Sequence, residues 1–353
     1  MVKHYDISLK FKKDWQQKIL NWYYLNKRDL PWRKKKNQNF YRIWISEVML
    51  QQTTVKAVIP YYQKFLKKWP SLKSFSSSSL DDILVIWQGL GYYQRARNLF
   101  KAKEYLKNKK LNINSKSLKN IPGIGDYISS AISAILKDEP CAVIDSNIKR
   151  IITRAFNLDI SKKSFHKELI FLAQQLTPNK YNRFYCQSLM DIANEICKSK
   201  TPECFVCPIE KLCISKGKNN YNLVKKKKIN KIGVIFVVRF KNEFCVEVSK
   251  KKILQGLYQF PMSKFVDNLP ADDSKKIIDR IIYLWKINNE LEEYSKIIST
   301  INHDFTHFHL KLNMVEIVLK KKKKISDYLW MNKNEFDKKP ISSLVRKAKK
   351  KIL

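Results

Sequence analysis

Hydrophobic residues in the first half of the chain recur at helical spacing. This spacing predicts successive amphipathic helices over residues 12–110 and 117–175. The positions that show it are Ile45, Val48 and Met49; Leu99, Ala102 and Tyr105; and Ile128, Ala131, Ile132 and Ile135. A Gly-x-Gly triplet at 89–91 and another at 123–125 each lie between two such segments, so a short helix, a glycine hairpin and a second helix are expected twice.

The composition of the second half is typical of β-strands. Residues 232–239 (IGVIFVVR) and 244–248 are rich in β-branched and aromatic residues, and residues 310–319 form a third such run. A helix is expected between Asp273 and Trp285. This mixture predicts a small α+β domain.

The chain has 353 residues, 44% of them hydrophobic, which is enough for two packed domains. Residues 214–231 (ISKGKNNYNLVKKKKINK) are polar and basic and are expected to be a linker. We therefore expect a helical domain over residues 1–213 and the α+β domain over residues 232–353.

A formal net charge of +39 favours a phosphate polyanion as partner. Abundant Lys, Asn and Ile leave a second interpretation open, since they are typical of AT-rich genomes. The sequence contains no run of about 18 apolar residues, so a membrane helix is not predicted. Met1–Asp14 lacks the apolar core of a signal peptide. A cytoplasmic protein without a membrane partner is expected, in which cysteines are poor disulfide candidates.

The strongest local pattern is the segment 117–136 (SLKNIPGIGDYISSAISAIL). Pro122 ends one helix, Gly123 and Gly125 allow a positive φ and a close backbone approach, and a second helix follows. Its free N-terminal amides are suited to a DNA phosphate. An ordinary αα-corner is the alternative.

Cys197, Cys204, Cys207 and Cys213 are spaced C-x6-C-x2-C-x5-C. Thiolates in this number suit zinc or an iron–sulfur cluster. Zinc sites usually take their cysteines from two closely spaced C-x2–4-C pairs. Only one such pair is present here, Cys204 and Cys207, which favours a [4Fe–4S] cluster.

Several motifs together resemble a known family. The hairpin IPGIG, the segment VIDSNIKR (143–150) and the cysteine spacing resemble the endonuclease III superfamily of DNA glycosylases. LPWR (30–33), SEVMLQQT (46–53) and GLGYYQRARNL (89–99) narrow the resemblance to the adenine DNA glycosylase (MutY) family. It implies an all-α helix-hairpin-helix domain with an iron–sulfur loop at 197–213.

The chemistry of the family needs a proton for the leaving base and an anion beside the sugar. The resemblance makes Glu47 the acid, in an apolar setting that raises a carboxyl pKa. It makes Asp145 the group that stabilises the oxocarbenium ion, with Asn147 as its orienting partner. The alternatives are a solvent-facing glutamate and a plain helix N-cap.

Tyr127 occupies the position where bifunctional relatives carry a Schiff-base lysine. The resemblance therefore implies a monofunctional enzyme that leaves an abasic site uncut. A supporting role near the sugar and simple packing are both open for this tyrosine. Further residues implied to contact DNA or the flipped base are Arg28, Trp32, Arg33, Asp191, Gln52, Thr53, Leu90 and Tyr92.

The second domain resembles the MutT-like, Nudix-fold domain of the same family through GLYQFP (256–261) and FTHFHL (305–310). No glutamate-rich Nudix box is present, so pyrophosphate hydrolysis is not expected. The resemblance implies reading of 8-oxoguanine by the three residues Phe305, Thr306 and His307. His303, His307 and His309 alternate as on one strand, but a metal site is not expected there.

The resemblance implies a DNA repair enzyme that acts as a monomer, in the nucleoid, on duplex DNA with an adenine mispaired with 8-oxoguanine or guanine. Ser146, Asn194, Glu195 and Thr306 depart from the family pattern, and Asn194 and Glu195 are expected to place bulk and charge near the cluster. The rivals are a lyase of endonuclease III type and a non-enzymatic DNA-binding protein.

Overall fold

The computed structural model describes residues 7–107, 109–216, 228–251, 253–267, 271–325 and 327–352. The chain forms two compact units, Met1–Ser77 with Asn98–Leu223 and Ser78–Arg97 with Val224–Leu353. Most of the expected linker 214–231 (residues 217–227) lies outside the described residues. The domain limits 1–213 and 232–353 remain predictions.

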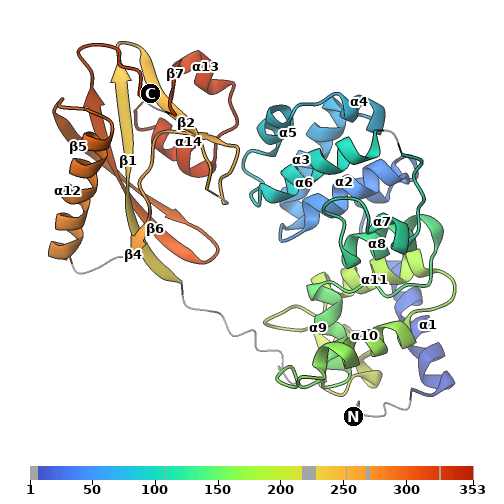
Figure 1. Ribbon diagram of the computed structural model, residues 1–353. Coiled ribbons are helices and arrows are strands. Elements are labelled where there is room, and N and C mark those ends of the chain that lie inside the picture. Colours follow the sequence, from blue (N-terminus) through green and yellow to red (C-terminus); the bar gives the residue numbers. More distant parts are fainter. Residues whose placement is uncertain are drawn as a thin grey trace. The chain divides into compact units, whose positions relative to one another are not determined.

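Regular structure in the described part of the first unit is helical, as the periodicity predicted (Figure 1). Its longer helices are α1 (Leu9–Asn26), α2 (Phe40–Leu50), α3 (Val55–Lys68), α6 (Gln94–Leu106, which begins in the second unit), α8 (Asp126–Lys137), α9 (Ser146–Ala155), α10 (Phe165–Leu176) and α11 (Asn182–Glu195). Short turns are η1 (Pro31–Arg33), η2 (Lys35–Asn37), α4 (Leu72–Ser76), α7 (Ser115–Leu118), η3 (Cys204–Val206) and η4 (Glu210–Leu212).

The core of this unit is aromatic. Trp15, Trp44 and Phe75 are fully or almost fully buried. The Trp15 indole of α1 donates to the Tyr185 hydroxyl of α11 at 2.9 Å, so the first helix is fastened to the last. This fastening gives α11 a fixed position beside the candidate site.

The expected hairpin is present between α7 and α8. Gly123 has φ +81°, and an added Cβ would lie 2.5 Å from the Asn98 Cβ, so only glycine fits. Gly125 differs from the expectation of a positive φ: it is the N-cap of α8 with φ −92°. An added Cβ there would meet nothing within 4 Å. The Gly-x-Gly triplet at 89–91 is also confirmed as a turn, with positive φ at Gly89 and Gly91.

The second unit contains helix α5 (Leu80–Trp87) and a seven-stranded sheet of order β3-β2-β1-β6-β5, with β4 beside β1 and β7 beside β2. The strands are β1 (Ile229–Phe240), β2 (Glu243–Val248), β3 (Tyr258–Gln259), β4 (Val266–Asp267), β5 (Ser295–Asp304), β6 (Phe308–Val318) and β7 (Leu329–Asn332). Its other helices are α12 (Ala271–Asn288), α13 (Lys333–Asp337) and α14 (Ser343–Lys349).

Strands β1 and β6 are parallel, and β5 and β6 form an antiparallel hairpin. Helix α12 covers one face of the sheet (Figure 1). On this face Trp285 stacks on Phe236 with ring centroids 3.9 Å apart. The three predicted strands and the predicted helix are confirmed. Among the described residues, no helix is long and apolar enough to cross a membrane.

The expectation that His303, His307 and His309 lie on one strand was wrong. His303 lies in β5, His309 lies in β6, and His307 lies in the turn between them, so the three do not share one strand. Alternation along a sequence cannot distinguish one strand from a tight hairpin when the turn carries an aromatic residue, as Phe305 does here.

Candidate active site

Glu47 lies in the buried middle of α2, which begins after the N-cap Asn39. Its side chain is almost wholly inaccessible, as the apolar neighbours predicted, and one carboxylate oxygen accepts a hydrogen bond of 2.8 Å from the Tyr127 hydroxyl. Burial raises the pKa of Glu47 to about 7, against the hydrogen bond from Tyr127, which lowers it. A large share of the Glu47 carboxyl groups therefore still carries the proton at neutral pH.

Tyr127 is the second residue of α8 and projects from the hairpin to α2. Burial and the nearby carboxylates of Glu47 and Asp145 raise its pKa well above the ordinary value. The hydroxyl is therefore neutral and acts as a hydrogen-bond donor.

Asp145 is the N-cap of α9. Its carboxylate accepts from the backbone N–H groups of Asn147 and Ile148 at 2.9 and 2.7 Å, and from the Asn147 amide at 2.9 Å. Burial raises the pKa of Asp145, and these three donors oppose that rise. The Asn147 amide therefore contacts Asp145 as expected of an orienting partner, and that role stays a prediction.

One cavity of about 370 Å³ brings these groups together, in the size range of small-molecule sites, about 300–1,000 Å³. The residues that line it include Glu47, Tyr127, Asp145, Asn147, Arg28, Trp32, Arg33 and Thr53. Eight of the residues selected from the sequence thus share one hollow, although they come from α2, α8, α9 and the loops near them.

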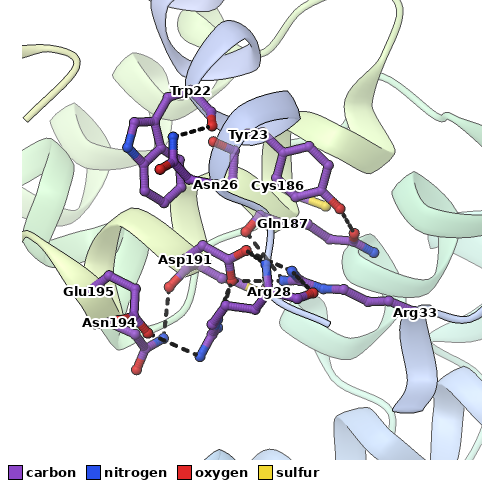
Figure 2. A network of polar contacts seen from close by, with 12 residues as sticks. Trp22, Tyr23, Asn26, Arg28, Arg33, Cys186, Gln187, Asp191, Asn194 and Glu195 are labelled. Carbon is purple, nitrogen blue, oxygen red and sulfur yellow. Dashed lines mark hydrogen bonds and ion pairs between the residues drawn. The ribbon is translucent and has the colours of Figure 1, made fainter. Parts of the chain in front are cut away.

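Asp191 of α11 lies behind this wall and is fully buried. It accepts from Arg28 Nε at 2.6 Å and from Arg33 Nη1 and Nη2 at 2.6 and 2.9 Å (Figure 2). The Arg28 backbone N–H adds a longer contact of 3.4 Å. Asp191 therefore fixes two guanidinium groups of the cavity wall.

The residues expected to wedge into the duplex differ in exposure. Gln52 has φ +55° and, like Thr53, follows the end of α2. In the second unit Leu90 is buried, which does not suit a wedge, whereas Tyr92 is 43% exposed. The Tyr92 hydroxyl lies 3.2 Å from the Thr306 hydroxyl, in the turn that was expected to read 8-oxoguanine.

That turn joins β5 to β6. Phe305 stacks on Phe308 with centroids 4.6 Å apart, and its N–H donates to the Phe308 carbonyl at 2.9 Å. His303 packs edge-on against the Phe305 ring. The aromatic stack holds the turn, so Thr306 and His307 stand at its tip.

The four cysteines of 197–213 line one small cavity of about 30 Å³. Arg154 of α9 donates to the carbonyls of Lys198 and Ser199 at 2.7 and 2.9 Å and to Cys197 Sγ at 3.3 Å. In the described part of the chain, no three His, Cys, Asp or Glu side chains converge as they would on one metal ion. The four cysteines are thus gathered around the same small cavity.

Four residues of α11 were not assigned to this cavity from the sequence, namely Gln187, Met190, Asn194 and Glu195. The sequence contained a signal, because Glu195 follows Asp191 by one helical turn. Asn194 and Glu195 line this cavity and not the cysteine cavity, which corrects the expectation for them. Ser146 begins α9 without a positive φ, so glycine is not required there.

Residues 45–178 match the family described as "HhH-GPD superfamily base excision DNA repair protein", and residues 234–351 match the NUDIX domain. A protein named adenine DNA glycosylase from Buchnera aphidicola subsp. Schizaphis graminum is 36% identical over 308 residues, which is 84% of this chain and 85% of that protein. Its namesake from Buchnera aphidicola subsp. Baizongia pistaciae is 33% identical over 95% of this chain and 96% of its own length.

Among solved structures, a thermostable thymine-DNA glycosylase superposes with a TM-score of 0.55 at 29% identity, covering 60% of this chain and all of its own. A trapped endonuclease III–DNA intermediate has a TM-score of 0.51 at 16% identity, over 60% of this chain and 98% of its own. The fold of the helical part is thus shared with both structures.

Proposed function

The chain belongs to the adenine DNA glycosylase family of base excision DNA repair enzymes, and we propose that it hydrolyses the N-glycosidic bond of adenine opposite 8-oxoguanine or guanine. The observation that carries the proposal is the buried Glu47, which is hydrogen bonded to Tyr127 and lines a cavity with Asp145. Two carboxyl groups in different settings can divide the acid and anion roles of this reaction.

In the first step a flipped adenine enters the cavity and Glu47 gives its proton to a ring nitrogen of the base. The C1′–N bond breaks, and its electron pair leaves with the protonated base. A pKa of about 7 leaves a large share of Glu47 protonated at neutral pH, so the acid form is available. Tyr127 holds the carboxyl group in place, since its hydroxyl donates to the oxygen that does not carry the proton.

Asp145 then lies opposite the positive charge that develops on the sugar. Three N–H donors hold its carboxylate in one orientation and favour the ionised form. A water molecule adds to C1′, and the Glu47 carboxylate takes the proton that this water loses. The products are free adenine and an abasic site.

No amine occupies the Tyr127 position, and this supports hydrolysis without strand cleavage. Among the described residues that line the cavity, Lys56 is the one lysine, and it is exposed on α3. A Schiff base at this lysine is the outcome that would assign lyase activity instead.

We assign Cys197, Cys204, Cys207 and Cys213 to a [4Fe–4S] cluster. A zinc ion needs all four sulfurs about 2.3 Å from one centre, whereas a cluster takes each thiolate on a different iron. The four cysteines line one cavity, and their spacing contains one short pair flanked by two longer arms, which fits the cluster better. When bound, the cluster would cross-link the loop that follows α11.

DNA binding by the hairpin is supported by the α8 amides, which carry no side-chain cap. Reading of 8-oxoguanine is supported by the aromatic turn that presents Thr306 beside Tyr92. We further propose that the enzyme acts as a monomer on chromosomal DNA.

The proposal is tested by single-turnover release of adenine opposite 8-oxoguanine. Glu47→Gln and Asp145→Asn keep the shape of each group, and each should slow release by about 10²–10⁴-fold. Asp14→Asn removes a half-exposed carboxylate of α1, which pairs with Lys18, and serves as the control. Release by Glu47→Gln at the wild-type rate would overturn the mechanism.

A further inference from the structure

The α11 wall of the cavity contains two carboxylates with opposite accessibility. Asp191 is fully buried, and both of its oxygens are occupied by guanidinium groups, so it has no free acceptor for a base. Glu195 lies one turn later on the same helix, with a side chain that is 55% exposed. Of these two carboxylates, Glu195 is the one that lines the cavity.

Glu195 is held toward the cavity but is not fixed there. Its Oε1 lies 3.8 Å from Arg28 Nη1, longer than the bonds of Arg28 to Asp191 (Figure 2). The Arg28 side chain is 20% exposed, so this loose pair borders solvent. Rotation of Glu195 toward a ligand would cost little.

The local charges also favour an acceptor at this position. Arg28 and Arg33 contribute two positive charges, and Asp191 contributes one negative charge. Glu195 contributes a second negative charge, so the net charge of the four side chains is zero. Glu195 lines the cavity, whereas Asp191 does not. A polar, neutral wall with one free anionic acceptor suits a base that presents a hydrogen-bond donor.

We propose that Glu195 accepts a hydrogen bond from the exocyclic amine of the flipped adenine and so selects an aminopurine over a keto base. An ionised carboxylate accepts and does not donate. Adenine carries an amine at C6, whereas hypoxanthine carries a carbonyl oxygen there, which a carboxylate repels. This inference rests on the proposed adenine excision and adds a specificity residue to it.

The test compares three target bases opposite 8-oxoguanine in single-turnover release: adenine, purine without the amine, and hypoxanthine. Glu195→Ala should slow adenine release at least about tenfold, as expected for a lost hydrogen bond to a charged group. It should leave purine release within about twofold, because purine makes no such bond. Glu195→Gln should lose less with adenine and gain with hypoxanthine, since its amide can also donate.

Asp14→Asn again controls for the change in net charge, and thermal melting of each variant controls for folding. Equal losses for adenine and purine would mean that Glu195 acts only through Arg28, and would overturn the inference. Unchanged adenine release by Glu195→Ala would overturn it as well. A wild-type protein that releases none of the bases would instead remove the proposed function on which the inference rests.

Discussion

Replacing Glu47 by Gln should stabilise the fold, and more so as the pH rises. The wild-type carboxyl is buried and hydrogen bonded by Tyr127. The variant keeps the shape of the group and an oxygen that accepts the same bond, but it cannot ionise. The cost of burying a charge is then absent.

The magnitude follows from the pKa of Glu47, which is about 7 in the folded protein and 4.5 as a free side chain. Below the lower value both states hold the proton. As the pH rises from the lower value to the upper one, the unfolded chain releases the proton first, so the wild-type protein loses stability. Between about pH 5 and about pH 8 this loss is about 2–3 kcal/mol.

Calorimetric melting of both proteins at these two pH values measures the effect. The advantage of Glu47→Gln in Tm should grow by about 5–10 °C from the acidic to the alkaline sample, given about 2–4 °C per kcal/mol for a unit of this size. The same variant should have lost base release. An advantage that is equal at both pH values, or that shrinks as the pH rises, would refute the reasoning.

Three further predictions follow. Tyr127→Phe removes the hydroxyl that lowers the pKa of Glu47. The pH above which the rate of base release falls should therefore rise in this variant. A pH–rate profile that does not move, or that moves to lower pH, counts against the hydrogen bond. Asp126, the first residue of α8, pairs with Lys119 beside the uncapped amides; Asp126→Asn should tighten duplex binding by about two- to fivefold in fluorescence anisotropy, most at low salt, and weaker binding would contradict the hairpin contact. Cys204→Ser should lose most of its iron by elemental analysis, and stoichiometric zinc in the wild-type protein would exclude the cluster.

Local features of the site could be predicted from the sequence. The apolar neighbours of Glu47 predicted its burial, and the order Asp145–Ser146–Asn147 predicted a helix cap. Both features depend on residues only a few positions away. The contact of Glu47 with Tyr127 could not be derived, since 80 residues separate them and only the packing of α2 against α8 joins them.

Features that depend on distant partners were predicted less well. The resemblance placed Asp191 toward the base, but its two arginine partners lie about 160 positions earlier and occupy both oxygens. Likewise, no local pattern indicates that Ser78–Arg97 groups with the C-terminal half of the chain. Such groupings depend on tertiary contacts that a periodicity does not encode.

The most direct measurement of the central claim uses duplexes that carry adenine opposite 8-oxoguanine, guanine, cytosine or thymine. Products are separated before and after treatment with hot alkali, with borohydride added to a parallel sample. The account predicts strand breaks only after alkali, only opposite 8-oxoguanine or guanine, and no trapped covalent complex. Breaks without alkali, or a complex trapped at Lys56, would contradict it.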